Sequence, residues 1–502
     1  MDFEVSSNSL DNISADAILL FAFEQKEGIL PSQGFLMLDK VLKNQISDFV
    51  KQENFKAKEG ELVIIHTCDK ILAPKVFVLG FGKKEEFNQN ILRKVISGFA
   101  KSNSKKLSSV ALLILEEKDF KIGAEVQSQV TSEGFLLGVY QFNKYKKKDE
   151  DVKELSLIIF SESNKNMALK IKEGVRTAEI FSNATKLCRD LVNEPSAVVD
   201  PTFLAQLAQD LSKKNKDLKC TVYDRLELEK IGMGAFLGVA KGAETPPKFI
   251  HLEYCPKGLS HKKQKLAIVG KGITFDSGGL SIKRGESMFD MKMDMAGAAV
   301  VLSVFSVISE IKPQMCIMGL IAATPNLISG KSLAPGDVLK AMNGTTIEVL
   351  HTDAEGRLTL ADSLSYAVKK GATEIIDLAT LTGACMVALG TEYAGLMGNN
   401  EELKSKLLKV AKETGEKVWE LPLVKEYKEL NKSEVADVSN TSSSRYGVAI
   451  TGGLFLEEFV DSKPWVHLDI AGPAYAEKSF ELGPKGGTGF GVRLMLNYLK
   501  SL

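Results

Sequence analysis

The sequence predicts an α/β protein with a small N-terminal α/β domain and a larger C-terminal α/β domain that has a central mixed sheet. Short apolar, β-rich runs alternate with helical patterns along the chain, which is typical of this class. The 502 residues exceed the roughly 100–200 residues of an ordinary domain, so more than one domain is expected. With 44% hydrophobic and 25% charged residues, the composition is that of a globular protein with a large core.

The first predicted domain comprises residues 1–165. Strands are expected at residues 62–65, 76–79, 110–115 and 155–160, with a helix around residues 91–99. Their alternation indicates a layered α/β domain. The stretch 144–154 is rich in lysine and is expected to be a solvated surface, because acidic residues interrupt its basic ones.

A connecting helix is predicted over residues 166–193, where a long helical pattern has no glycine or proline after Gly174. Pro195 marks its end, because proline disfavours the helical conformation in the residue before it. Asp200 and Pro201 then supply an N-cap residue and a proline at the first helical position, so a new helix begins there. Residues 194–502 are therefore assigned to the larger domain.

The larger domain contains several expected strands separated by helical or glycine-rich sequence. They cover residues 249–254, 266–269, 315–321, 347–350, 374–378 and 465–470. We find no internal repeat and no low-complexity tract. These elements favour a central sheet with helices packed on it.

The charge balance excludes a protein whose main task is to coat nucleic acid or an anionic membrane. Lys and Arg number 64, as do Asp and Glu, whereas such partners select a basic surface. The N-terminus lacks the features of a secretory signal, and the apolar stretch 316–328 falls short of the roughly 20 residues that span a bilayer. The six cysteines show no C-x-x-C spacing, so we expect reduced thiols and a cytoplasmic location.

Most of the unusual chemistry lies between Lys271 and Gly383. The run from Leu266 to Gly279 predicts a buried strand that leads into a glycine-rich loop carrying Lys271 and Asp276. Ligands of open α/β sheets bind at the carboxyl ends of the strands, where this loop would lie. The spacing of a phosphate-binding loop is absent. A tight turn with an exposed lysine and aspartate is the alternative interpretation.

Two further segments carry acidic residues beside expected helices. Asp294 lies just before a helix or in its first turn, and helix capping is its alternative role. Asp353 and Glu355 follow the strand at 347–350 and are two residues apart, so in an extended segment both side chains face the same side. The helix after them is expected to end before Gly371, with cations in its last turn.

Four carboxylates at strand ends would repel one another strongly unless cations neutralised them. They are Asp276, Asp294, Asp353 and Glu355, and a pair of divalent ions that activates water would meet this need. The five histidines form no ligand-spaced pair and no H-E-x-x-H motif, so a conventional zinc protease is not expected. There is no G-x-S-x-G motif, and Ser277 is interpreted as a loop residue.

At these motifs the chain closely resembles the leucyl aminopeptidase family, also called cytosol aminopeptidases. The segment 352–358 reads T-D-A-E-G-R-L, nearly the whole of the family signature N-T-D-A-E-G-R-L. The segments 270–279, 291–295 and 378–383, together with Lys283, match in the same order. With weaker likeness at residues 193–195 and 465–472, the resemblance covers about the whole C-terminal domain.

The resemblance implies a metallo-exopeptidase that removes N-terminal residues from peptides with two divalent ions, Mn²⁺ or Zn²⁺. By this likeness Asp276, Asp353 and Glu355 hold one ion. The second ion is held by Lys271, Asp276, Asp294 and Glu355. Lys271 must then be deprotonated, which two nearby dications favour. A bridging water becomes the nucleophile, because the metals lower its pKa.

The same resemblance implies roles for residues around the metals. Lys283 polarises the scissile carbonyl and stabilises the oxyanion. Arg357 binds a bicarbonate ion that takes the proton of the water, and its planar guanidinium suits a bidentate partner. The implied substrate-binding positions are Met291, His351, Thr380, Leu381 and Gly383, and an apolar first-residue pocket favours leucine-like side chains. The family forms homohexamers, so a homohexamer that acts on peptides is expected.

His351 departs from the family, whose signature has asparagine at this position. Asparagine donates an amide hydrogen bond beside the substrate, whereas histidine is bulkier and titrates near neutral pH. We therefore expect altered substrate binding and an altered pH profile, with the metal ligands unaffected.

Two other classes of protein are alternatives. A binding protein that keeps the fold, such as a nucleic-acid-binding factor, would lack metal ligands, and none is missing here. A phosphate-transferring enzyme would need a phosphate-binding loop, which is absent. A nucleic-acid partner is accordingly not expected.

Overall fold

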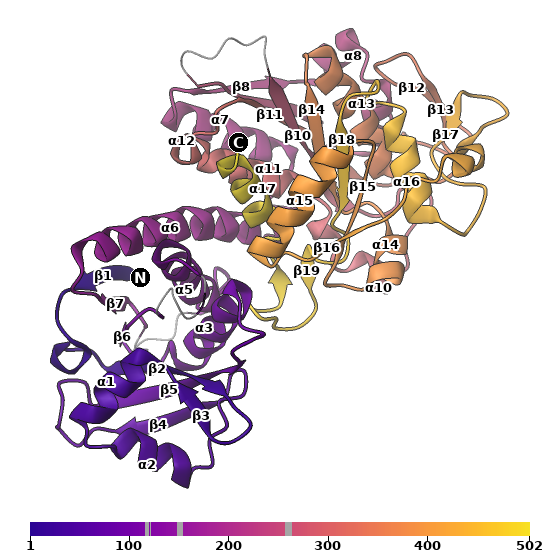
Figure 1. Ribbon diagram of the computed structural model, residues 1–502. Helices are drawn as coiled ribbons and strands as arrows, with labels where there is room; N and C mark the ends of the chain where they lie inside the picture. Colours follow the sequence, from indigo (N-terminus) through magenta and orange to yellow (C-terminus); the bar gives the residue numbers. More distant parts are fainter. Residues whose placement is uncertain (116–119, 121, 148–153, 257–263) are drawn as a thin grey trace. The chain divides into compact units, whose positions relative to one another are not determined.

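A computed structural model describes residues 1–115, 120, 122–147, 154–256 and 264–502 (Figure 1). The chain forms two compact units, one of residues 1–183 and 479–484 and the other of residues 184–478 and 485–502. Both contain a sheet covered by helices, which confirms the predicted α/β class. Part of the charged stretch 144–154 lies outside the described residues.

The first unit is built on a largely parallel sheet in the order β1-β7-β6-β2-β5-β4, with β3 paired to β2. Among the strands that the structure describes in this sheet, only β4 and β3 run antiparallel to their neighbours. The strands are β1 (Asp2–Ser6), β2 (Ala17–Glu24), β3 (Ile29–Pro31), β4 (Leu62–His66), β5 (Lys75–Lys83), β6 (Ser109–Leu112) and β7 (Leu157–Ser161). Strand β2 was not predicted from the sequence, although this central strand is almost entirely buried.

Helices cover both faces of this sheet. One apolar core includes residues of α1 (Gln33–Val41) and α2 (Gln45–Gln52). The other includes residues of α3 (Gln89–Asn103), α5 (Ala124–Gly138) and the start of α6 (Lys165–Asn193). Burial on both faces explains why the parallel strands are continuously apolar rather than alternating.

A helix is found where one was predicted over residues 166–193: α6 covers Lys165–Asn193, and the division between the two units falls within it. The next helix, α7 (Pro201–Lys214), begins as the sequence predicts. The Asp200 side chain accepts a hydrogen bond of 2.7 Å from the backbone N–H of Phe203, and Pro201 occupies the first helical turn.

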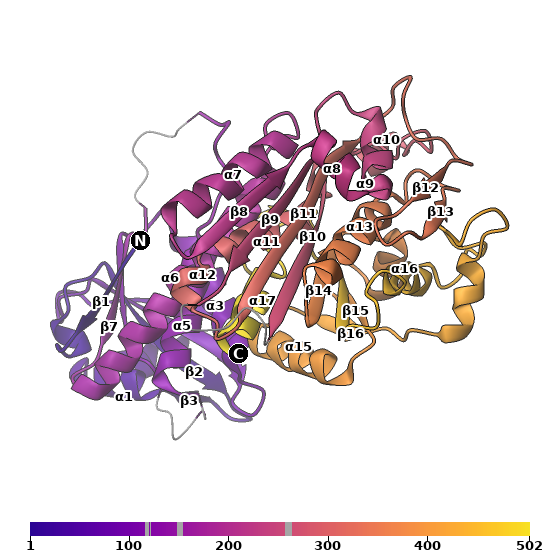
Figure 2. The ribbon, with the colours of Figure 1, turned by 90° about the horizontal axis from the view of Figure 1, so that it is seen from above.

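The second unit has a mixed sheet in the order β16-β15-β18-β14-β10-β11-β9-β8 (Figure 2). The four inner strands are parallel: β10 (Lys265–Asp276), β11 (Cys316–Asn326), β14 (Glu374–Ala379) and β18 (Trp465–Asp469). The outer strands are β8 (Leu218–Tyr223), β9 (Lys248–Tyr254), β15 (Ala394–Gly398) and β16 (Val418–Glu420), and β9 and β15 pair antiparallel with the inner strands. The carboxyl ends of the inner strands therefore meet at one edge.

Helices and two small sheets complete the second unit. The helices are α8 (Arg225–Ile231), α9 (Gly234–Val239), α10 (Gly285–Met288), α11 (Ala296–Ser306), α12 (Ile308–Ile311), α13 (Glu355–Lys369), α14 (Gly383–Leu389), α15 (Glu401–Thr414), α16 (Val448–Glu457) and α17 (Val492–Lys500). One small sheet contains β12 (Val338–Lys340), β13 (Thr346–Glu348) and β17 (Val438–Ser439), and the other contains β19 (Tyr475–Ala476) and β20 (Gly486–Gly487). Gly371 follows α13 with a positive φ of 80°, as the predicted helix end requires.

Strand β10 is longer than the sequence predicts. We expected a loop after residue 269, but the strand continues to Asp276 and includes Lys271, which is 3% exposed. The glycines permit close packing instead of a turn, since a Cβ at Gly270 would lie 2.4 Å from the carbonyl oxygen of Gly297 in α11. The interpretation of Lys271 as an exposed turn residue is therefore wrong.

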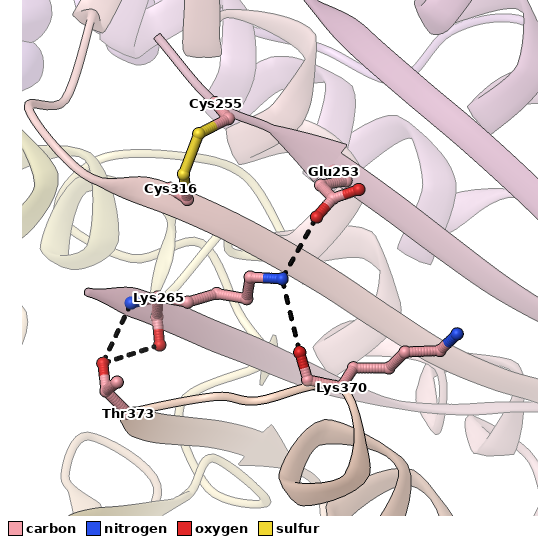
Figure 3. The surroundings of a disulfide bond; sticks show 6 residues. All are labelled: Glu253, Cys255, Lys265, Cys316, Lys370 and Thr373. Atoms are coloured by element: carbon pink, nitrogen blue, oxygen red, sulfur yellow. Dashed lines mark hydrogen bonds and ion pairs between the residues drawn. A yellow bond between two sulfur atoms is a disulfide. The ribbon is translucent and has the colours of Figure 1, made fainter. Parts of the chain in front are cut away.

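The expectation of six reduced cysteines is wrong for one pair. Cys255, directly after β9, forms a disulfide with Cys316 at the start of β11 (Figure 3). The two strands run antiparallel and Tyr254 pairs with Ile317, so the register places the cysteines opposite each other with their Cα atoms 4.2 Å apart. The two cysteines are 61 residues apart in the sequence, and only the pairing of β9 with β11 brings them together.

We searched the described residues for helices that combine the length and the apolar character needed to cross a membrane, and found none.

Candidate metal centre and active site

The carboxylates singled out in the sequence gather at the carboxyl ends of the inner strands. Asp276 is the last residue of β10, and Asp353 and Glu355 lie in and just after the turn that precedes α13. One ligand oxygen from each of these three lies within 4.8 Å of the others. Asp294 follows a 3₁₀ turn (Met291–Met293) and precedes α11, and its side chain caps neither helix.

Two lysines connect these acids. Lys271 Nζ lies 2.7 Å from Asp294 Oδ2 and 2.9 Å from Glu355 Oε1, and it donates a hydrogen bond to the carbonyl of Thr380. Lys283 Nζ lies 2.8 Å from Asp276 Oδ2 and 2.5 Å from Asp353 Oδ1. The structure thus brings both predicted lysines into the carboxylate cluster.

Neighbouring polar groups orient Asp276 and Asp294. Asp276 Oδ1 accepts hydrogen bonds from the Asn326 side chain at 2.8 Å and from the backbone of Gly278 at 2.9 Å. Asp294 Oδ1 accepts a hydrogen bond of 2.6 Å from the Thr380 hydroxyl. Asn326 ends β11 and Thr380 follows β14, so the two strands beside β10 supply these groups.

A glycine makes room for the central lysine. A Cβ at Gly356, in the first turn of α13, would lie 2.6 Å from Cε and 2.8 Å from Nζ of Lys271. No side chain is tolerated there without moving Lys271, because real Cβ atoms do not approach other atoms so closely. This packing explains the glycine between Glu355 and Arg357.

Burial and mutual repulsion control the charges of this cluster. Burial, with the nearby charge of Asp276, raises the pKa of Glu355 to about 8, and burial raises the pKa of Asp294 to about 6. Burial lowers the pKa of Lys271, but Asp294 and Glu355 outweigh it and hold this pKa above its ordinary value. In the same way, Asp276 and Asp353 raise the pKa of Lys283. Both lysines are therefore ammonium groups when no metal is present.

Several buried oxygens of the cluster lack hydrogen bonds. Asp294 Oδ2 and Asp353 Oδ1 lie beside ammonium groups without hydrogen-bonding geometry, and Glu355 Oε2 has no hydrogen-bond partner among the described residues. A buried oxygen without a partner is costly, and hard divalent cations prefer carboxylate oxygen. The donor set therefore fits divalent metal ions.

Arg357 lies in the first turn of α13 and is 4% exposed. Its guanidinium carbon lies 6.0 Å from the centre of the Phe455 ring in α16. Burial lowers the pKa of Arg357 to about 10, so the group is still charged at neutral pH. Its Nε atom is buried without a hydrogen-bond partner in the part of the chain that is described, which leaves a donor for an anion.

The predicted substrate-binding residues lie on three segments around this cluster. Met291 belongs to the 3₁₀ turn before Asp294, whereas Thr380 and Leu381 lie between β14 and α14, and Gly383 is the first residue of α14. The Thr380–Asp294 hydrogen bond joins these two segments. The side chain of His351 is exposed, and its Nδ1 lies 3.3 Å from the backbone N–H of Asp353, which donates to it.

Three residues that hold the site together were not predicted from the sequence. Asn326 supports Asp276, as described above. Asp469, at the end of β18, accepts hydrogen bonds from the backbone of Leu381 and from the Thr382 hydroxyl. Asn440 binds the backbone around His351. Polar residues at strand ends could have indicated Asn326 and Asp469, but no signal in the sequence indicates Asn440.

Ser277 is not placed as a nucleophile. Its hydroxyl donates a hydrogen bond of 2.7 Å to the backbone carbonyl of Asn326 and accepts one from the backbone of Gly279. This supports its interpretation as a loop residue.

Comparison with family descriptions gives matches over both units. Residues 186–496 match the catalytic domain of the cytosol aminopeptidase family, and residues 19–149 match its N-terminal domain. A probable cytosol aminopeptidase from a Sulfurihydrogenibium species is 45% identical over 504 residues, covering 99% of this chain and 98% of the relative. A probable cytosol aminopeptidase from Aquifex aeolicus is 45% identical over 466 residues, covering 92% of each chain.

Solved structures are similar over almost the whole chain. A mutant of tomato leucine aminopeptidase is 33% identical with a TM-score of 0.87, covering 100% of this chain and 97% of that one. The bottromycin maturation enzyme BotP in complex with Mn is 29% identical with a TM-score of 0.84, covering 97% of this chain and 99% of that one.

Proposed function

Because this chain belongs to the cytosol aminopeptidase family and is therefore a metallo-exopeptidase, we propose that it is a two-metal aminopeptidase. It removes N-terminal residues, preferably leucine-like ones, from peptides. The observation that carries this proposal is the cluster of Asp276, Asp353 and Glu355, whose ligand oxygens lie within 4.8 Å of one another beside two lysines.

The donor set supports two adjoining metal sites. Asp276, Asp353 and Glu355 would hold one ion, and Lys271, Asp276, Asp294 and Glu355 the other, with Mn²⁺ or Zn²⁺ as the metals. The Mn-bound BotP structure supports manganese. Two such ions supply a water of lowered pKa and polarise a carbonyl. Lys271 must lose its proton to act as a ligand, although Asp294 and Glu355 favour its charged form.

The side chains around the acids suit peptide hydrolysis. Lys283 is an ammonium group beside Asp276 and Asp353, so it can stabilise the oxyanion of the scissile carbonyl. Arg357 keeps its charge in a buried place, and its Nε–H has no hydrogen-bond partner within the described part of the chain, so it can bind a bicarbonate ion that accepts a proton. Met291, His351, Thr380, Leu381 and Gly383 are proposed to contact the substrate.

The proposal includes an assembly and a location. We propose a homohexamer, which native mass spectrometry tests; a monomeric mass would contradict this part alone. A cytoplasmic location is supported by the names of the relatives, which are probable cytosol aminopeptidases.

Hydrolysis of a chromogenic leucyl amide tests the proposed activity. We expect release of the chromophore when Mn²⁺ or Zn²⁺ is added to the purified chain, and loss of this activity after chelation or in Asp353→Ala, because Asp353 is a proposed ligand. An N-terminally acetylated substrate is the control, since an exopeptidase needs the free amine. Absence of any metal-dependent release of an N-terminal residue would contradict the proposal.

Substitution of His351 by asparagine tests the departure from the family. We expect His351→Asn to change KM by about twofold to tenfold, which corresponds to one hydrogen bond, or to alter the pH dependence of kcat/KM. The metal content should stay the same, because the ligands are elsewhere. Equal kinetics of the two forms from neutral to alkaline pH would show that His351 has no role in substrate binding.

A further inference from the structure

A single buried amide holds the segment that carries the proposed ligand Asp353 and leads directly into Glu355. Asn440, directly after β17, is 0% exposed. Its Oδ1 accepts hydrogen bonds from the backbone N–H groups of Leu350 at 2.9 Å and His351 at 3.3 Å. Its Nδ2 donates to the carbonyl oxygens of His351 at 2.8 Å and Ala354 at 3.4 Å. One side chain therefore satisfies four backbone groups on both sides of Asp353.

This segment, residues 349–354, has no regular structure of its own, since β13 ends before it and α13 begins after it. From the other side it is held through Thr352, whose hydroxyl donates to the carbonyl of Gly278 and accepts from the backbone of Ser281. The position of Asp353 thus depends on side-chain contacts with two segments distant in sequence.

The amide chemistry is specific to this position. The segment offers N–H groups and carbonyl groups together, and only a side chain with both a donor and an acceptor in one plane pairs with both. Aspartate has the same shape, but it accepts only, so at position 440 it would face the carbonyls of His351 and Ala354 without a donor.

We infer that Asn440 is a positioning residue of the metal centre, which sets the approach of Asp353 and Glu355 to Asp276 by fixing the backbone of residues 350–354. The inference rests on the proposed function, because it gives these acids the role of metal ligands. Outer residues that orient ligands typically change metal affinity by about 10–100-fold. The four hydrogen bonds of Asn440 to this segment all involve backbone groups, so Asn440 acts through the backbone.

Metal titration of the metal-free full-length chain tests this inference. We would measure the Kd of Mn²⁺ by competition with a chromophoric chelator in wild type, Asn440→Asp and Asn440→Ser. The expected result is a Kd about 10–100-fold weaker in both variants. The variants should stay folded by circular dichroism, and Asn440→Ser decides the result if Asn440→Asp does not fold.

Asp437→Ala is the matched control. Asp437 lies three residues before Asn440 and accepts hydrogen bonds from the backbone N–H of Thr346 at 2.8 Å and from its hydroxyl at 2.7 Å. It therefore attaches the segment 437–440 to β13 through hydrogen bonds to Thr346, so its substitution should leave the Kd near that of wild type.

The outcomes separate this inference from the proposed function. A wild-type chain that binds no Mn²⁺ would contradict the two-metal proposal itself. Wild-type affinity in the folded Asn440 variants would overturn the positioning role alone. An equal loss of affinity in Asp437→Ala would also overturn it, because the affinity would then depend on the general attachment of the segment 437–440 to β13.

Discussion

Glu355→Gln is expected to lower kcat/KM by about a thousandfold or more. Glutamine has the same shape as glutamate, but it removes the charge of a residue proposed to bridge both metals. Loss of the metals forfeits several kcal/mol of transition-state stabilisation, and each ~1.4 kcal/mol is a factor of ten in rate. The measurement is hydrolysis of a leucyl amide, together with the Kd of Mn²⁺ for the metal-free chain.

Glu416→Gln is the matched control for this substitution. Glu416 is also buried, at 4% exposure, but it accepts hydrogen bonds from the backbone of Gly491 and Leu494 at the start of α17. It should retain metal binding and activity. Near-normal activity and metal content in Glu355→Gln would contradict the assignment of Glu355 as a ligand.

The pH dependence of metal binding in the wild-type chain tests whether Glu355 and Asp294 are metal ligands. Ligands bind a metal in their deprotonated forms, so binding releases protons from groups whose pKa values are raised in the metal-free chain. The pKa of Glu355 is about 8 and that of Asp294 about 6, so the affinity should increase as the pH rises from 6 to 8. A constant or falling affinity over this range would contradict this explanation.

Lys283→Ala is expected to lower kcat by about 10²–10³-fold, as loss of an oxyanion-stabilising group does. The metal content should not fall, because Asp276 and Asp353 lose only the Lys283 ammonium group, which competes with the metals for their oxygens. Lys283→Arg should recover part of the rate, since it keeps the charge but alters the geometry. The measurements are kcat with a leucyl amide and the bound metal per chain.

Lys265→Ala controls for the loss of a partly buried lysine on the same sheet. Lys265 is the first residue of β10, whereas Asp276 is its last. The Nζ atom of Lys265 lies 3.2 Å from Glu253 Oε1 (Figure 3). Its kcat should equal that of wild type. If Lys283→Ala kept a wild-type kcat, or lost its metal, then the proposed role of Lys283 would be wrong.

Local patterns in the sequence predicted several elements of the fold. The N-cap at Asp200, the helix end at Gly371 and the buried strand β11 each depend on a few neighbouring residues. Such features follow from backbone preferences and from burial, which a short stretch of sequence already expresses. The two-domain α/β class follows from their order.

The pairing of strands that are distant in the sequence could not be predicted from the sequence. The full length of β10 depends on its parallel neighbours β11 and β14, which continue the pairing beyond Val269. The disulfide between Cys255 and Cys316 depends in the same way on the register of β9 and β11. Register is a property of two segments together, so no single segment predicts it.

By itself the sequence identified the acids, the lysines and the arginine, because four carboxylates at predicted strand ends need cations, and because their motifs resemble a known family. The tertiary structure alone decided which of them meet and what holds them: Lys271 between Asp294 and Glu355, and Asn440 on the backbone beside Asp353. The physical reason is that residue type limits the chemistry of a side chain, whereas its pKa and its partners depend on burial and on groups that only folding brings within a few ångströms.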